Sequence, residues 1–332
     1  MSTLTRRIYA LLALAAAAAL APDPAAACTT STTSTNLGSA SSYAIATTVQ
    51  QGSGSAGLQC DILLAALTTH YVGLRVDASS FLLTGPGGQT IPYVASLTAN
   101  GTPLAVGNFQ DLSSTSLVSL FSGTSNSIPI YFRTAATPAL QAGTYSGFVD
   151  LRWYYSVCSL GVVACLAFSE SPGFVRPVLI GSPTWGSGTA VRVNVTLTVE
   201  NDCVITAPSA SFGSAPLVGS FNPITRTILI RCSAGASYTV GLNDGNNPDS
   251  GVRRMRSGAN YLRYEIYKTA ASGDRWGAVG GDRRSSATAD SNAGIYDSVT
   301  TQGFTYRAAI LPGQTTPPAG SYTDTILVDV AF

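Results

Sequence analysis

The sequence predicts an all-β protein made of two related β-sandwich domains in tandem. Short segments in which apolar and polar residues alternate recur along the chain, for example at 227–231, 238–242 and 261–267. Turns rich in Gly, Pro, Asn and Ser separate these segments, and no long helical periodicity follows residue 27. Many short strands with regular turn signals are typical of β-sandwiches. An internal repeat indicates that the sandwich occurs twice.

The repeat is weak but its parts keep their order. Cys28 and Cys60 are 32 residues apart, and Cys203 and Cys232 are 29 apart. Ala-Gly-Thr-Tyr at 142–145 returns as Ala-Gly-Ser-Tyr at 319–322, an offset of 177 residues. At this offset one alternating apolar set matches another: Val149, Leu151, Trp153 and Tyr155 match Ile326, Val328, Val330 and Phe332. We expect domains at 28–188 and 189–332, with the Gly- and Ser-rich stretch 181–188 as the linker.

The first 27 residues have the layout of a signal peptide. Arg6 and Arg7 precede an apolar run at 8–21, and three alanines at 25–27 supply a cleavage site. The apolar run is too short to span a membrane. We therefore expect residues 1–27 to direct export through the periplasm. Cys28 would then begin the mature chain, where it either forms a disulfide, the reading we favour, or carries a lipid anchor.

Six cysteines in an oxidising compartment suggest three disulfides. Six cysteines allow 15 pairings, so the sequence alone does not fix them. Cys158 and Cys165 enclose a six-residue apolar segment that we expect their own disulfide to close.

Charged residues make up 11% of the chain, against about 25% in a typical soluble domain. With a net charge of +1 and a single lysine, Lys268, nucleic acid is not an expected partner. Residues 28–190 hold nine charged residues and 191–332 hold twenty-three. The charge-poor first domain either has a plain Ser- and Thr-rich surface or presents a contact surface that loses its water cheaply.

No pattern of catalytic or metal-binding residues is present in the sequence. His70 is the only histidine, and neither Cys-x-x-Cys nor Gly-x-Ser-x-Gly occurs. Gly85–Gly88 reads as a turn, because it lacks the lysine of a phosphate-binding loop. Residues 244–249 are rich in Asp and Asn but lack the spacing of a calcium loop. We expect neither an enzyme nor a cofactor.

From Cys203 onward the chain resembles the spore coat protein U-like domain, the pilin domain of archaic chaperone–usher pili. The resemblance is carried by Cys203, Phe212-Gly213, the strand that ends at Cys232, Trp276-Gly277 and the closing pattern from Gly320 to Phe332. It implies an immunoglobulin-like, pilin-type sandwich that lacks one strand and awaits a donor strand from a neighbouring pilin subunit. It also implies a periplasmic pilus chaperone and an outer-membrane usher as partners.

Two predicted strands acquire a role from this resemblance. The last strand places Ile326, Val328, Val330 and Phe332 on one face, as in the element that a chaperone grips, and it can equally be a last core strand. The strand before Cys203 alternates in the same way and contains Val191, Val193, Val195, Leu197 and Val199. We expect its first part to complete the first domain as an internal donor and the rest to begin the second. A plain first strand of the second domain is the alternative.

Cys28 directly after the cleavage site leaves no extension to donate, which is a property of the subunit at the end of a fibre. The resemblance therefore extends to two-domain tip adhesins of Csu-type pili, which attach to abiotic or host surfaces and promote biofilms. Candidate contact residues lie in two apolar stretches of the first domain: Leu160, Val162 and Val163, and Leu117, Val118, Leu120 and Phe121. The second stretch is equally consistent with a core strand. The competing functions are a non-adhesive coat or fibre subunit and a carbohydrate-binding lectin.

Overall fold

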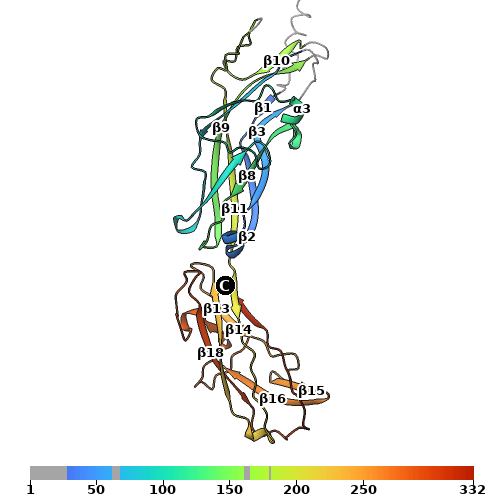
Figure 1. Ribbon diagram of the computed structural model, residues 1–332, viewed down its shortest axis with the longest axis vertical. Helices are drawn as coiled ribbons and strands as arrows, with labels where there is room; N and C mark the ends of the chain where they lie inside the picture. The colour runs from blue at the N-terminus through green and yellow to red at the C-terminus, as the bar shows by residue number, and fades with distance from the viewer. Residues whose placement is uncertain (1–27, 62–67, 161–164, 179–180) are drawn as a thin grey trace, which may run out of the picture.

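The computed structural model describes residues 28–332 except 62–67, 161–164 and 179–180, so the predicted signal peptide lies outside the described residues. Figure 1 shows an elongated molecule in which two β-rich domains follow one another end to end. The expected all-β fold with tandem sandwiches is confirmed. Among the described residues, no helix is both long enough and apolar enough to cross a membrane.

The first domain contains β1 (Cys28–Thr30), β2 (Thr33–Ser41), α2 (Ser42–Thr47), β3 (Gln51–Cys60), β4 (Tyr71–Ala78), β5 (Leu82–Thr84), β6 (Thr90–Ser96), β7 (Phe109–Asp111), α3 (Leu117–Leu120), β8 (Ser127–Thr134), β9 (Gly143–Leu160), β10 (Ala167–Glu170) and β11 (Thr189–Glu200). Its strands are ordered β1-β3-β8-β6-β5-β9-β11-β2, and β4 and β10 also pair with β9.

The second domain contains β12 (Cys203–Thr206), β13 (Ile224–Cys232), β14 (Thr239–Leu242), β15 (Arg253–Ser257), β16 (Asn260–Tyr267), β17 (Arg284–Ser285), β18 (Gln302–Ile310) and β19 (Val328–Ala331). A five-stranded sheet, β12-β13-β18-β16-β15, faces a three-stranded sheet, β17-β14-β19.

The two domains repeat the same internal construction. Cys28 lies opposite Cys60 across β1 and β3, and Cys203 lies opposite Cys232 across β12 and β13, and each pair forms a disulfide. Each core also holds a fully buried tryptophan, and each indole N–H donates to a backbone carbonyl, Trp153 to Ala56 at 2.8 Å and Trp276 to Val240 at 2.9 Å. The hydrogen bond removes the cost of burying the indole N–H.

The expected division after residue 188 differs from the packing, in which β11 lies in the first domain along its whole length. The stretch 181–188 is not a linker in the structure. Trp185 packs against Phe109, with 4.9 Å between the ring centroids, and Thr184 pairs with Val175. The chain passes to the second domain between Glu200 and Cys203. There α2 meets the second domain through a buried contact of 2.6 Å between the hydroxyls of Ser42 and Ser233.

Candidate functional site: an open groove and an apolar tip

In the first domain, β11 fills the gap between β9 and β2. It runs antiparallel to β9 and parallel to β2, so both of its edges are hydrogen-bonded. Its inward residues are Val191, Val193, Val195, Leu197 and Val199, and none of them is more than 5% exposed. All five lie in the core of the first domain. In the packing, therefore, the whole strand completes the first domain, and not only its first part as expected.

In the second domain the corresponding place is a groove. Residues 203–332 are all described, and among them no strand lies between the segment that follows β12 and the segment that leads into β19. These two segments, which include Ala207–Ala210 and Tyr322–Ile326, line a cavity of about 480 Å³. Its floor is largely apolar and consists of Ile228, Leu242, Tyr264, Ile266, Tyr306 and Ala308. The second sandwich is thus open where the first is filled.

The last strand shows the effect of the missing neighbour. Ile326, Val328 and Val330 pack against the core of the second domain but are only half-buried. The residues that correspond to Ile326 and Val328 at the offset of 177 are Val149 and Leu151, and both are 0% exposed beside β11 in the first domain. Regular pairing with β14 begins only at Val328. Phe332 is 58% exposed and does not join the apolar face on which the sequence placed it.

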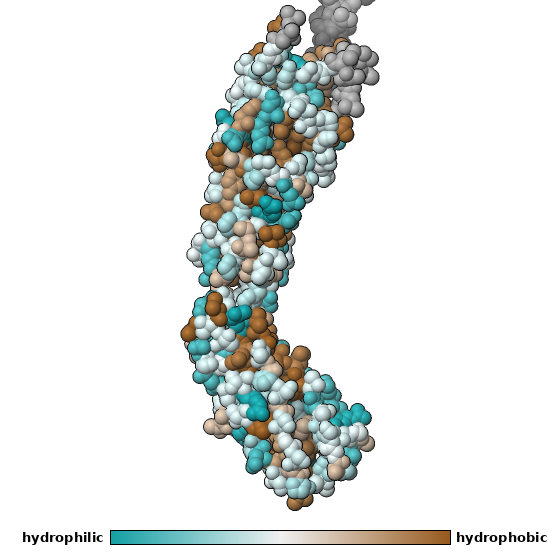
Figure 2. All heavy atoms as spheres, viewed as in Figure 1, coloured by the Kyte–Doolittle hydropathy of each residue, from teal (hydrophilic) through white to brown (hydrophobic). Residues whose placement is uncertain are grey.

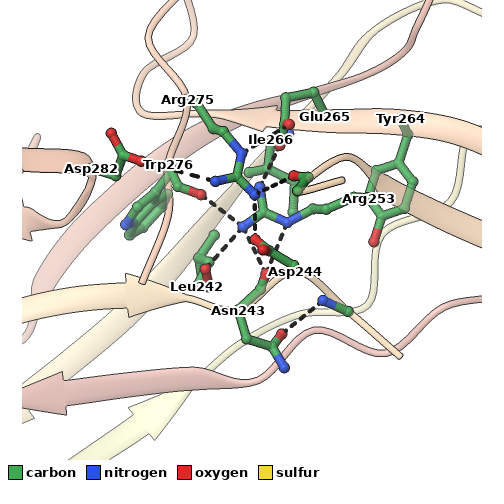
Figure 3. Close-up of polar contacts among 12 residues, drawn as sticks. Leu242, Asn243, Asp244, Arg253, Tyr264, Glu265, Ile266, Arg275, Trp276 and Asp282 are labelled. Carbon is green, nitrogen blue, oxygen red and sulfur yellow. Dashed lines mark hydrogen bonds and ion pairs between the residues drawn. The ribbon is translucent and has the colours of Figure 1, made fainter. Parts of the chain in front are cut away.

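A buried arginine joins the strands that carry the floor of the groove (Figure 3). Arg253 is 0% exposed and forms an ion pair with Glu265 of β16. Its Nη2 donates to the carbonyls of Leu242, Asn243 and Trp276 at 2.9, 2.7 and 2.8 Å. One side chain therefore joins β14, β15 and β16 to the segment that carries Trp276. The buried charge is tolerated because its partners satisfy it.

Arg253→Met is expected to destabilise the second domain by about 3–5 kcal/mol. The buried carbonyls of Leu242 and Trp276 and the half-buried carbonyl of Asn243 lose this donor. Glu265 keeps its hydrogen bond from the Ile266 N–H at 2.9 Å and its 3.0 Å contact with Arg275 Nε, but it loses its buried partner. Urea unfolding of the full chain, followed by tryptophan fluorescence, measures the loss. Arg256→Met is the matched control, because Arg256 lies on the same strand but is exposed. Equal stability of the two variants would contradict the structural role of Arg253.

The far end of the first domain carries exposed apolar residues. Figure 1 places β10 at the end of the molecule that faces away from the second domain. A disulfide joins Cys158 of β9 to Cys165, and the next residue, Leu166, is 78% exposed. Val178, in the segment bracketed by the pairing of Val175 with Thr184, is 96% exposed. Val162, Val163 and the side chain of Leu160 lie outside the described residues.

The second candidate contact stretch is mostly core, not surface. Leu117, Leu120 and Phe121 are 7, 6 and 3% exposed, whereas Val118 is 59% exposed. The stretch is neither a contact loop nor a strand but the short helix α3, where Ser116 Oγ accepts the N–H of Ser119. Helical spacing turns Leu117, Leu120 and Phe121 inward and Val118 outward. Three of the four residues are therefore corrected to core residues.

Arg176 joins the segments at this end. Its Nη1 donates to Ser156 Oγ at 2.6 Å, and its Nη2 donates to the carbonyl of Thr69. The guanidinium also lies 3.8 Å from the ring centroid of Phe168 in β10 and 5.0 Å from that of Tyr71 in β4. Such stacking suits the planar cation. The segments that present Leu166 and Val178 are thus fixed relative to one another.

Figure 2 shows apolar residues exposed among pale, weakly polar ones on the face of both domains that it draws.

In the described part of the chain, no three His, Cys, Asp or Glu side chains gather in a way that could hold a metal ion. His70 donates from Nε2 to the carbonyl of Thr115 at 3.0 Å.

Two tandem sandwiches, one complete and one open, define a tandem pilin-like protein. The model of the Spore Coat Protein U domain family matches residues 14–151 and 189–329. The chain therefore belongs to that family, with two copies of the domain. The second match begins at the first residue of β11, so this strand belongs by sequence to the second copy and by packing to the first.

Similar solved structures lie among pilus subunits. A chain of the CsuC–CsuE chaperone-tip adhesion subunit pre-assembly complex from archaic chaperone–usher Csu pili of Acinetobacter baumannii is 32% identical, with a TM-score of 0.69. That match covers 92% of this chain and 100% of the other. The likeness supports an adhesin subunit, and the proteins named are not enzymes.

Two weaker likenesses are the CupB6 tip adhesin from Pseudomonas aeruginosa and CfaE, the adhesive subunit of CFA/I fimbria of enterotoxigenic Escherichia coli. The first is 13% identical with a TM-score of 0.27 and covers 85% of each chain. The second is 12% identical with a TM-score of 0.29 and covers 90% of this chain and 92% of the other. Scores of this size do not establish a common fold. No curated protein matches the chain.

Proposed function

We propose that the chain is the tip adhesin subunit of an archaic chaperone–usher pilus. The second domain accepts a donor strand from the neighbouring pilin subunit, and the first domain contacts an abiotic or host surface and promotes biofilm formation. The observation that carries the proposal is that one chain contains the same sandwich twice, once filled by β11 and once open. Because a strand fills the gap in the first sandwich, we infer that the second sandwich also takes up a strand.

Strand addition suits the chemistry of the groove. Half-buried Ile326 and Val328 and the apolar floor gain a cover. The backbone of Thr323 and Leu327 already bonds to Arg256 and Asn243, so an added strand would pair with the alternate residues Tyr322, Asp324 and Ile326. An open edge of this kind promotes aggregation unless it is covered. A periplasmic chaperone is the partner expected to cover it before assembly, with Val330 and neighbouring residues of β19 in contact, and an outer-membrane usher then exchanges it for the donor strand. The likeness to the chaperone–adhesin complex supports the chaperone as partner.

For surface attachment we propose the apolar end of the first domain. Leu166 and Val178 are exposed there, and we include Leu160, Val162 and Val163 from the adjacent segment between Cys158 and Cys165. The disulfide limits the entropy that the loop loses on contact. A neighbour's strand enters at the second domain, so the first domain stays free to face outward. The protein would thus be exported through the periplasm and displayed at the pilus tip.

Replacing Leu166 and Val178 by Asp is expected to reduce attachment to hydrophobic plastic at least about tenfold without changing the number of fibres, because two charges would have to lose their water on contact. Cell adhesion assays and fibre counts by electron microscopy measure the two effects. Val279→Asp is the control, since Val279 is 74% exposed but lies in the second domain. Unchanged attachment would contradict the assignment of the contact surface, and lost fibres would favour a structural subunit.

A further inference from the structure

The open groove of the second domain differs from the filled one beside the middle inward residue of the filling strand, Val195 of β11. Val195 of β11 lies opposite Gly147 of β9, and Gly147 corresponds to Asp324 at the offset of 177. A Cβ atom at Gly147 would lie 2.7 Å from the carbonyl of Leu82 and 3.2 Å from Leu83 Cδ2. The first domain therefore has no room for a side chain beside Val195, whereas the second domain places a carboxylate there.

The Asp324 carboxylate is held in place at the groove. Its Oδ2 accepts the hydroxyl of Tyr264 at 2.6 Å, and its Oδ1 accepts the backbone N–H of Asn246 at 2.8 Å. Burial, together with the hydrogen bond to Asp324, raises the pKa of Tyr264, so this hydroxyl remains a donor. Asp324 also lines the cavity that a donor strand would fill. A carboxylate has about four acceptor positions, and these contacts use two of them.

The residue of a donor strand that faces Asp324 would lie close to this carboxylate. Directly opposite residues on antiparallel strands have Cβ atoms about 4.5–5.5 Å apart. A valine there removes water from the carboxylate and offers no hydrogen bond in return. A threonine of the same shape can donate its hydroxyl to an ionised acceptor, which is a strong kind of hydrogen bond. The floor around this position favours aliphatic side chains at the neighbouring inward positions.

We propose that the groove of the second domain selects a donor strand with a hydrogen-bond-donating side chain opposite Asp324 and aliphatic side chains opposite Tyr322, Ile326 and Val328. The partner strand is thus of the same type as β11 but polar at its middle inward position. This inference rests on the proposed strand exchange and adds the side-chain chemistry that the groove prefers. It makes Asp324 a specificity-determining residue.

Peptides based on β11 test the preference with the full chain. The parent peptide has the sequence of residues 189–200, and fluorescence anisotropy of the labelled peptide measures Kd. The variant Val195→Thr is expected to bind about tenfold more tightly than the parent, because it satisfies the carboxylate. The matched variant Val193→Thr faces Ile326 and is expected to bind about tenfold more weakly. Equal or tighter binding of the parent relative to Val195→Thr would overturn the proposal.

A change on the protein side provides the reciprocal test. In the Asp324→Gly chain, which recreates the first domain's arrangement, the parent peptide is expected to bind at least as tightly as Val195→Thr. The peptide series with the unchanged chain decides the question even if this variant does not fold. If no peptide binds the unchanged chain, strand exchange itself fails and this inference fails with it. If all three bind equally, strand exchange stands and the selectivity of Asp324 is refuted.

Discussion

A chain that ends at residue 188 is expected to lose the folded first domain, whereas a chain that ends at residue 200 keeps it. The difference is β11, which buries Val191, Val193, Val195, Leu197 and Val199 and pairs along both edges. Each buried aliphatic side chain contributes about 1.5–3 kcal/mol, so the five together amount to roughly 7–15 kcal/mol. Whole domains are stable by only about 5–15 kcal/mol.

The test compares exported fragments 28–188 and 28–200 by near-UV circular dichroism and thermal unfolding. Fragment 28–188 is expected to lack a cooperative transition and to recover one when a peptide of residues 189–200 is added. Within 28–200, Val193→Asp is expected to abolish the transition. Thr196→Asp is the control, because Thr196 lies on the face of β11 that points away from the core. Similar transitions for the two fragments would mean that β11 does not complete the sandwich.

The repeated fold could be predicted because its signals are local. Period-two alternation and turn residues mark strands without any knowledge of their partners. The same property explains why the division expected after residue 188 does not follow the packing of β11. The alternation of residues 191–199 shows which side chains share a face, but it fits a strand of either domain equally well. Only the register, Val193 opposite Val149, assigns β11 to the first sandwich.

The contact residues were harder to predict. Leu117, Leu120 and Phe121 are spaced as on a helix, and Ser116 before them is a helix-capping residue, so the sequence held a signal for their burial in α3. In a Ser-rich stretch that forms only a four-residue helix, this helical signal is no stronger than the signals for a strand or a loop. Exposure of Leu166 has no sequence signal of its own, because an exposed leucine and a buried one look alike until the packing is known.

The arginine contacts could not be found from the sequence, because their partners are distant along the chain. Arg176 binds the carbonyl of Thr69, 107 residues earlier. Arg253 binds Glu265 and three carbonyls that come together only when β14, β15 and β16 have assembled. No spacing rule connects such groups. Asp324 belongs to the closing pattern of the family, yet its position beside an open groove required the filled copy for comparison.

Adding a copy of residues 189–200 after Phe332, through a short turn, is expected to close the second domain with its own strand. In the first domain β11 runs antiparallel to β9, and residue 189 pairs with Trp153, the counterpart of Val330. A turn of about 2–5 residues can therefore bring the added strand back along residues 320–330. Covering the groove is expected to raise the Tm of the second domain by more than about 10 °C, since five aliphatic residues become buried.

The same change is expected to abolish co-purification with a chaperone and incorporation into fibres, because the groove is then occupied. Differential scanning calorimetry measures the rise in Tm, and affinity purification from periplasmic extract measures the loss of the chaperone. The control extension has the same composition in a scrambled order that breaks the alternation, and it should leave both properties unchanged. If the ordered and scrambled extensions give the same Tm and the same chaperone complex, the cavity beside Ile326 and Val328 is not a strand-accepting groove. A raised Tm with chaperone binding intact would show instead that the chaperone grips another part of the domain.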